Sequence, residues 1–140
     1  MAEDGATAEP DSGQDQQEDT GQKKALLVDD SPLDQLKFEE MLERLGFKVT
    51  VAPNGHVAIS MLDKVMPDLI VLDVIMPMKS GIQILDEIRA MAKFRNVPIV
   101  MLTSKDDVRM IRAALKKGPT DYLLKSLPPE EIEDRIKRYI

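Results

Sequence analysis

Short apolar runs alternate along the chain with segments in which apolar residues recur every three or four positions. Four of the runs are continuous or nearly so, as expected for strands that are buried on both faces of a parallel sheet. They cover residues 25–28, 69–72, 97–102 and 122–124. In a fifth stretch Phe47, Val49 and Val51 alternate with polar residues, which predicts a strand with one exposed face. The chain is therefore expected to contain five strands.

The segments between these runs carry the periodicity and the boundary residues of helices. Ser31-Pro32 is typical of a helix start, because Ser caps the first free N–H groups and Pro suits the first helical position. Asn54-Gly55 predicts a turn before the second helix. Strands and helices that alternate with short connections predict a parallel sheet covered by helices on both faces.

The last two predicted helices cover residues 106–117 and 129–140. The first of them is expected to begin with a capping arrangement between Ser104 and Asp107. The second is expected to turn Ile132, Ile136 and Ile140 toward the sheet.

Composition and charge exclude several classes of protein. The 140 residues include no Cys and a single His, which excludes disulfide frameworks, thiolate metal sites and multi-histidine metal sites. No apolar run approaches the roughly 20 residues of a membrane span, and the polar N-terminus is not a signal peptide. We therefore expect a cytoplasmic protein without membrane contact.

The formal charge of −6 is distributed unevenly. Residues 1–22 hold seven acidic residues and no Lys or Arg, while the remainder has 18 acidic and 19 basic residues. The first 22 residues also lack large apolar side chains, so they are expected to form a disordered acidic tail. Residues 23–140 are expected to form one domain, without the positive charge that nucleic-acid binding requires.

Polar side chains follow four of the five predicted strands. Asp29-Asp30 follows the first strand, Asp73 the third, Thr103 the fourth and Lys125 the fifth. In parallel α/β sheets ligands bind beyond the carboxyl ends of the strands, so these groups should meet at one edge. An all-oxygen set suits Mg²⁺ or Mn²⁺, and a carboxylate beside such an ion is a nucleophile toward phosphorus. Each residue alone has an ordinary structural explanation; their joint placement does not.

The polar residues of this edge lie in stretches of sequence that resemble a known family. Four stretches in order, at residues 26–31, 69–81, 97–104 and 118–125, resemble the receiver domain of two-component response regulators. The resemblance spans residues 23–140. It implies an α/β fold of the flavodoxin-like type, a doubly wound (βα)5 three-layer sandwich with parallel strand order 2-1-3-4-5.

The resemblance also implies roles for individual residues. Asp73 would be the phosphoacceptor. Mg²⁺, for which Mn²⁺ can substitute, would be bound by the side chains of Asp29, Asp30 and Asp73 and by the backbone carbonyl of Ile75. Asp29 would act through water. Lys125 would pair with the phosphoryl group or with Asp73. Thr103 would be the switch hydroxyl, and Tyr122 the aromatic residue that follows it.

Signalling would follow from these roles by resemblance. The phosphoryl donor would be a histidine kinase or a phosphotransfer protein, and the chain would catalyse only its own phosphorylation and dephosphorylation. The output face would comprise helix 106–117, strand 121–125 and helix 129–140, presented to an unknown output protein by a monomer or a phosphorylation-dependent dimer. With no effector domain after the last helix, a stand-alone receiver is expected; a piece of a larger regulator stays an alternative.

Two positions depart from the family pattern. Ser126 stands where the family usually has a Pro that follows the Lys, often through a cis bond. A cis bond before a non-proline residue costs about 2.5–4 kcal/mol, so we expect a trans Lys125–Ser126 bond, or a strained cis bond retained by the fold. Pro119 replaces a small residue and is expected to stiffen the approach to the last strand.

Three other functions compete with the phosphorylated switch. A pseudo-receiver would act as an interaction module without using Asp73, which the intact set of acids, Thr103 and Lys125 argues against. A flavodoxin-like cofactor binder would need a phosphate-binding first loop, and Asp29-Asp30 has the wrong charge for an anion. A haloacid-dehalogenase-type phosphatase would need a second Asp two residues after Asp29, where Ser31 stands.

Overall fold

The computed structural model of the chain describes residues 21–104, 112–113, 115–116 and 118–140. Within this part of the chain one parallel sheet has strands β2 (Lys24–Val28), β3 (Lys48–Ala52), β4 (Leu69–Asp73), β5 (Ile99–Thr103) and β6 (Asp121–Leu124). Their order across the sheet is β3-β2-β4-β5-β6. Counted along the chain this is 2-1-3-4-5, so the predicted topology is confirmed.

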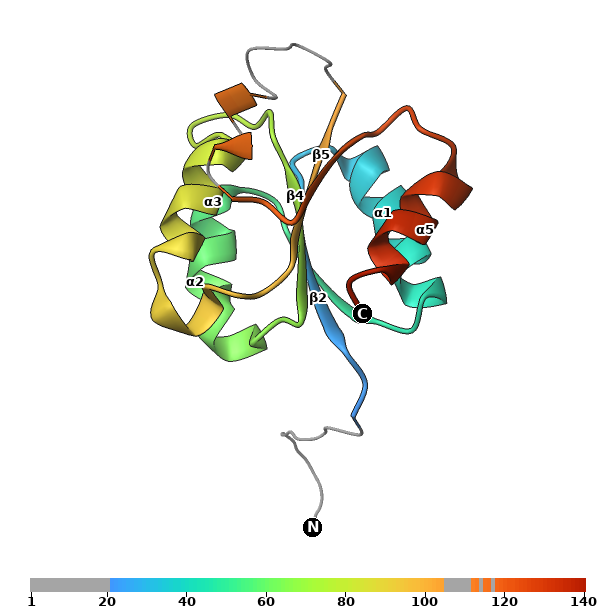
Figure 1. Ribbon diagram of the computed structural model, residues 1–140, viewed down its shortest axis with the longest axis horizontal. Coiled ribbons are helices and arrows are strands. Elements are labelled where there is room, and N and C mark those ends of the chain that lie inside the picture. The colour runs from blue at the N-terminus through green and yellow to red at the C-terminus, as the bar shows by residue number, and fades with distance from the viewer. Residues whose placement is uncertain (1–20, 105–111, 114, 117) are drawn as a thin grey trace.

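Helices cover both faces of the sheet (Figure 1). α1 (Pro32–Arg44) and α5 (Pro129–Lys137) pack on one face, and α2 (Gly55–Val65) and α3 (Gly81–Arg89) pack on the other, followed by the short 3₁₀ helix η1 (Ala92–Phe94). This is the predicted three-layer, doubly wound α/β sandwich. The acidic segment 1–20 and most of the predicted helix 106–117, including its capping residue Asp107, lie outside the described residues.

Two clusters of buried side chains fill the spaces between the layers. One lies under α2 and α3 and includes Leu62 and Leu85, and the other lies under α1 and α5 and includes Phe38 and Ile132. β4 and β5 are buried along their full length, as their continuous apolar sequence predicts. Burial at this scale, at roughly 25 cal/mol per Å² of apolar surface, is the main force that holds the sandwich together.

The helix starts show which local predictions hold. Ser31 caps α1 and its hydroxyl accepts a hydrogen bond from the N–H of Asp34, with Pro32 as the first helical residue. The turn predicted at Asn54-Gly55 is wrong in detail: Asn54 caps α2 through the N–H of Val57, and Gly55 already belongs to the helix. Asn forms both turns and helix caps, so the dipeptide alone does not distinguish them.

The chain end and the last strand connection bear on two further predictions. Ile132 and Ile136 are buried as predicted, but Ile140 is 44% exposed, because α5 ends at Lys137 and the helical periodicity stops with it. No cis peptide bond occurs among the described residues. The Lys125–Ser126 bond is therefore trans, the first of the two outcomes expected from Ser126.

One glycine sets the geometry at the end of β4. The N–H of Gly81 donates to the carbonyl of Val74 at 2.8 Å, which brings the start of α3 against the chain that leaves the sheet. A Cβ added at Gly81 would collide with the backbone carbonyl of Asp73. Only Gly permits this close approach, so Gly81 helps to place Asp73 at the edge of the sheet.

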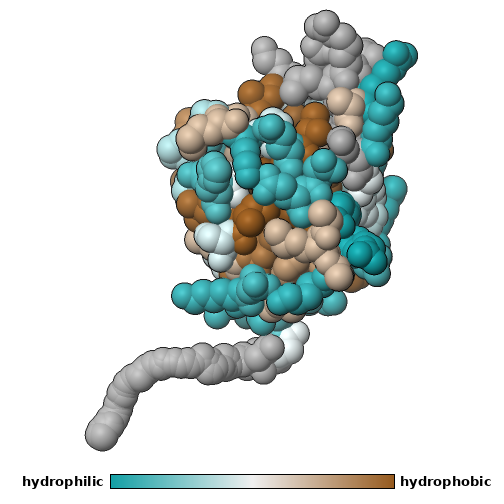
Figure 2. Space-filling view, turned by 90° about the vertical axis from the view of Figure 1, so that its left-hand side faces the viewer, coloured by the Kyte–Doolittle hydropathy of each residue, from teal (hydrophilic) through white to brown (hydrophobic). Residues whose placement is uncertain are grey.

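The surface over α2 and α3 is mainly hydrophilic, with smaller apolar areas between the polar side chains (Figure 2). None of the helices in the described part of the chain is long and apolar enough to cross a membrane.

Candidate functional site: a carboxylate cluster at the carboxyl edge of the sheet

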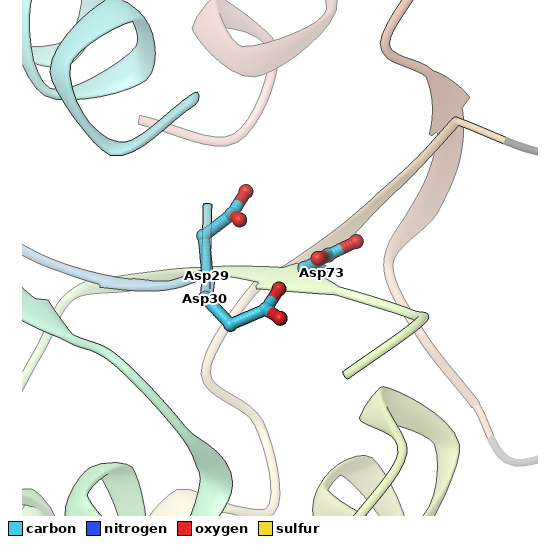
Figure 3. Close-up of side chains that lie close together, drawn as sticks. All are labelled: Asp29, Asp30 and Asp73. Carbon is cyan, nitrogen blue, oxygen red and sulfur yellow. The ribbon is translucent and has the colours of Figure 1, made fainter. Parts of the chain in front are cut away.

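Three aspartates from two neighbouring strands meet beyond the sheet. β2 pairs with β4 so that Val28 lies opposite Leu72, which places Asp29 and Asp30 beside Asp73. One carboxylate oxygen from each of the three lies within 4.8 Å of the other two. Figure 3 shows the three side chains gathered past the ends of the strands. The structure thus brings together the three acids that the sequence predicted at this edge.

The three acids differ in burial and support. Asp29 is 1% exposed and Asp73 is 5% exposed, whereas Asp30 faces solvent. The Asp29 carboxylate accepts a hydrogen bond from the backbone N–H of Ser31 at 2.9 Å. The Gln35 side chain donates to the Asp29 carbonyl at 2.7 Å. Asp29 is therefore held in place by the start of α1, and Asp30 is the open side of the cluster.

Crowding of negative charge changes the proton affinity of Asp73. Burial, then repulsion from Asp29 and to a smaller extent Asp30, raise the pKa of Asp73 from 3.8 to about 7, against the lowering effect of Lys125 and of a hydrogen bond from the Ile75 backbone. Near neutral pH the Asp73 carboxyl is therefore partly protonated. A cation bound at the cluster would relieve the same repulsion.

Lys125 provides the positive charge at this edge. Its Nζ lies 2.9 Å from Asp29 Oδ2, 2.7 Å from Asp34 Oδ2 and 3.5 Å from Asp73 Oδ1. Burial acts to lower the pKa of Lys125, but hydrogen bonds to Asp34 and Asp29 and the charge of Asp73 outweigh it and raise the pKa to about 12. Lys125 is therefore a permanent cation shared by three carboxylates.

The predicted switch residues lie on the two adjoining strands. Thr103 is fully buried at the end of β5, and its carbonyl accepts a hydrogen bond from the N–H of Lys125 at 2.7 Å. Tyr122 is half-buried in β6, packs against the core under α2 and α3, and pairs with Met101. Ile75 is 41% exposed beside the cluster, where its backbone forms a hydrogen bond with Asp73.

Asp34 is the site residue that the sequence analysis missed. It lies in the first turn of α1, and that turn begins at the end of β2, the edge where the other acids gather. Its position three residues after the capping Ser31 was the available signal. A carboxylate there also has an ordinary role at a helix N-terminus, which conceals its contact with a Lys 91 residues further along the chain.

The donor set fits a hard divalent cation. Three carboxylates converge without sulfur or imidazole, two of them buried, in an arrangement that is electrostatically unfavourable without a bound cation or proton. Mg²⁺ needs few protein ligands because it keeps several waters. The residues present are thus suited to Mg²⁺.

Comparison with known proteins identifies the family. Residues 25–137 match the profile of the response regulator receiver domain. The chain is 36% identical over 115 residues to the probable transcriptional regulator ycf27 of Guillardia theta, covering 82% of this chain and 44% of that protein. It is 38% identical over 120 residues to an uncharacterized 14.6 kDa protein of Leptolyngbya boryana, covering 84% and 90%. The chain thus spans less than half the length of the ycf27 relative.

Solved structures agree with that match. The chemotaxis protein CheY4 of Vibrio cholerae superimposes with a TM-score of 0.80 at 28% identity, covering 86% of this chain and 100% of that one. The receiver domain of sensor histidine kinase PA1611 from Pseudomonas aeruginosa, with magnesium in its active site cleft, gives 0.78 at 32% identity, covering 85% and 98%. The BeF3-activated receiver domain of Klebsiella pneumoniae RstA gives 0.78 at 30%, covering 84% and 97%.

Receiver domains bind Mg²⁺ in an acidic active site and pair with histidine kinases and phosphotransfer proteins. The fold, the acidic cluster and the sequence match agree with one another. This chain belongs to the response regulator receiver domain family of two-component phosphorelay signalling.

Proposed function

We propose that Asp73 accepts a phosphoryl group from the phosphohistidine of a kinase or phosphotransfer protein, and that the phosphorylated chain signals through its C-terminal face. The observation that carries this proposal is the placement of Asp73 within the carboxylate cluster and 3.5 Å from the Lys125 ammonium. A nucleophile for phosphorus, a cation site and a fixed positive charge are the parts that phosphoryl transfer requires.

Mg²⁺, or Mn²⁺ in its place, would be held by Asp29, Asp30, Asp73 and the Ile75 carbonyl, with Asp29 acting through water. When bound, the ion supplies charge neutralisation for the carboxylates and the incoming phosphoryl oxygens. This leaves Asp73 deprotonated at neutral pH. In the transfer, an Asp73 carboxylate oxygen forms a bond to phosphorus while the phosphorus–nitrogen bond breaks, and the imidazole nitrogen keeps the electron pair.

Two donors of this chain would then respond to the new charge. Lys125 attracts the phosphoryl oxygens, and the Thr103 hydroxyl turns toward them. The hydrogen bond between the Lys125 N–H and the Thr103 carbonyl already joins the ends of β5 and β6. Tyr122 would follow Thr103 and change the face formed by helix 106–117, β6 and α5. That helix lies largely outside the described residues, so the face is proposed from the sequence and from its two described elements.

Residues 23–140 act as the receiver domain and residues 1–22 as an acidic tail, in a cytoplasmic protein that is a monomer or a phosphorylation-dependent dimer. The chain catalyses only its own phosphorylation and dephosphorylation. In the second of these a water oxygen bonds to phosphorus, the Asp73–phosphorus bond breaks, and the products are the carboxylate, inorganic phosphate and a proton.

Intact mass measurement after incubation with acetyl phosphate tests the proposal directly. We expect the wild-type chain with Mg²⁺ to gain the mass of one phosphoryl group, and expect no gain with EDTA or in Asp73→Asn. Asp63→Asn, the same chemical change on an exposed residue of α2, is the matched control and should react like wild type. Absence of a gain in the wild type, together with absence of Mg²⁺ binding, would leave a phosphorylation-independent interaction module.

A further inference from the structure

Lys125 is shared between the predicted phosphorylation site and a carboxylate outside it. An ammonium group has three N–H donors. Two of them form hydrogen bonds, at 2.9 Å to Asp29 and at 2.7 Å to Asp34. The Asp73 oxygen is 3.5 Å away, beyond the usual length of a charge-assisted hydrogen bond. The ammonium thus lies nearer to Asp34 than to the residue on which we propose the phosphoryl group forms.

Asp29 and Asp34 hold Lys125 under different constraints. Asp29 is buried, and its other carboxylate oxygen accepts the backbone N–H of Ser31, so it stays in place when Lys125 moves. The Asp34 side chain is 32% exposed on the first turn of α1. Water can therefore replace Lys125 around Asp34, and α1 offers its positive N-terminal end to the released carboxylate. Asp34 is the partner that Lys125 can exchange.

We propose that Asp34 is a positioning residue that competes with a phosphoryl group on Asp73 for the Lys125 ammonium, and so weakens the hold of the site on that group. This inference rests on the proposed function. A phosphoryl group on Asp73 adds oxygens that need donors, and Lys125 meets that need by giving up its contact with Asp34. Asp34 therefore favours the unphosphorylated arrangement, because breaking its contact with Lys125 offsets part of the attraction between Lys125 and the phosphoryl group.

Beryllofluoride affinity measures this competition, since it is an equilibrium quantity and the probe activates a receiver of the same fold. With saturating Mg²⁺ and calorimetric detection, Asp34→Asn should bind beryllofluoride about two- to fivefold more tightly than wild type, the scale of a partly exposed ion pair. Glu40→Gln removes an equal charge from an exposed position on the same helix and should change the affinity less than twofold. An unchanged or weaker affinity in Asp34→Asn would overturn the proposal.

A double-mutant cycle separates competition for Lys125 from simple removal of negative charge. In a Lys125→Met background Asp34→Asn should lose its effect. An equal gain in beryllofluoride affinity in the Lys125→Met background would overturn the proposal that Asp34 competes for Lys125. A crystal structure of Asp34→Asn gives a second readout that needs no phosphoryl mimic: Lys125 Nζ should move to about 2.9 Å from Asp73 Oδ1, and an Nζ that stays at its present distance would also overturn it.

The two proposals fail in different ways. If the wild type gains a phosphoryl group from acetyl phosphate and Asp34→Asn behaves like it in the affinity measurement, only the role of Asp34 is overturned. If the wild type neither reacts with acetyl phosphate nor binds beryllofluoride, the proposed function fails and the role of Asp34 falls with it.

Discussion

The two ends of β6 lie beside aspartates whose negative charge is neutralised to different degrees by neighbouring basic side chains. At its amino end the Asp121 carboxylate accepts two hydrogen bonds from Arg135, at 2.9 and 2.6 Å, and one from the Tyr139 hydroxyl at 2.7 Å. At this end one carboxylate is paired with one guanidinium group. At the carboxyl end Lys125 faces Asp29, Asp34 and Asp73, and Asp30 adds further negative charge to the cluster.

This difference distinguishes a structural ion pair from a functional one. The bidentate Arg135–Asp121 pair ties α5 to the sheet with matched geometry, and nothing is gained there by adding an ion. The opposite edge keeps an excess of negative charge that a bound cation or a proton can neutralise. A fold that stores such an excess is less stable for it, and measurements of stability should reveal the cost.

The largest effect is expected from Asp73→Asn measured without divalent cations. The pKa of Asp73 is raised from 3.8 to about 7, so the folded state binds the proton more tightly than the unfolded state. The contribution of Asp73 to wild-type stability is therefore most favourable below the unfolded pKa and is lost as pH rises from about 4 to 7. At pH 8 Asp73→Asn should be about 2–4 kcal/mol more stable than wild type, and at pH 4 nearly equal to it.

Urea denaturation in EDTA at the two pH values checks this prediction. Asp63→Asn removes an exposed carboxylate and should show no such dependence. A variant at Asp73 that is less stable than wild type at pH 8 would mean that Lys125 already compensates the cluster, and the contrast between the two ends of β6 would disappear.

At the compensated end the sign should reverse. Asp121→Ala removes the acceptor of Arg135 and Tyr139, and we expect a loss of about 1.5–3 kcal/mol in the free energy of unfolding. Arg135 is 32% exposed, which favours the lower half of that range because water can solvate part of the guanidinium. Chemical denaturation at pH 7 measures it. A gain in stability in Asp121→Ala would mean that Arg135 does not neutralise Asp121, so that both ends of β6 would carry excess negative charge.

Magnesium binding should show the same excess charge as a pH dependence. Because the ion displaces the proton on Asp73, the affinity should fall about tenfold from pH 8 to pH 6, as expected for one proton with a pKa of about 7. Titration calorimetry in two buffers of different ionisation enthalpy also counts the released proton. In Asp73→Asn any residual affinity should be nearly independent of pH in this range. An equal dependence in that variant would assign the proton to another residue.

Local sequence signals predicted the strands and helices that form the two ends of the sheet. Continuous apolar runs identified the buried strands, and Ser31-Pro32 identified the start of α1. Once the strands were known to be parallel, their carboxyl ends had to share an edge, which put Asp29, Asp30 and Asp73 on that edge. That the first and third strands are neighbours, so that the three acids meet, followed from the strand order that the family resemblance implied. The roles assigned to Thr103 and Tyr122 came from family resemblance and stay predictions.

The side-chain pairs could not be predicted in this way. Lys125 and Asp34 are 91 residues apart and meet only in the folded chain, because the first turn of α1 and the residue after β6 lie at the same edge of the sheet. Asp121 and Arg135 meet through the packing of α5 on the sheet. Periodicity shows which face of a helix is buried, but not which polar residue at its border reaches a partner on another element.

The smallest effect is expected from an ion pair that lies at neither end of β6. Lys93 Nζ lies 2.6 Å from Asp63 Oδ1, as short as the Arg135–Asp121 contact, yet the two side chains are 60% and 77% exposed. Water screens such a pair and ordering the side chains offsets its attraction. Asp63→Asn should therefore change the free energy of unfolding by less than about 0.5 kcal/mol at pH 7 in EDTA. A loss comparable to that of Asp121→Ala would show that hydrogen-bond length decides the strength of these pairs. The expected small loss assigns the difference to burial, which is also the property that makes the uncompensated charge of Asp73 costly.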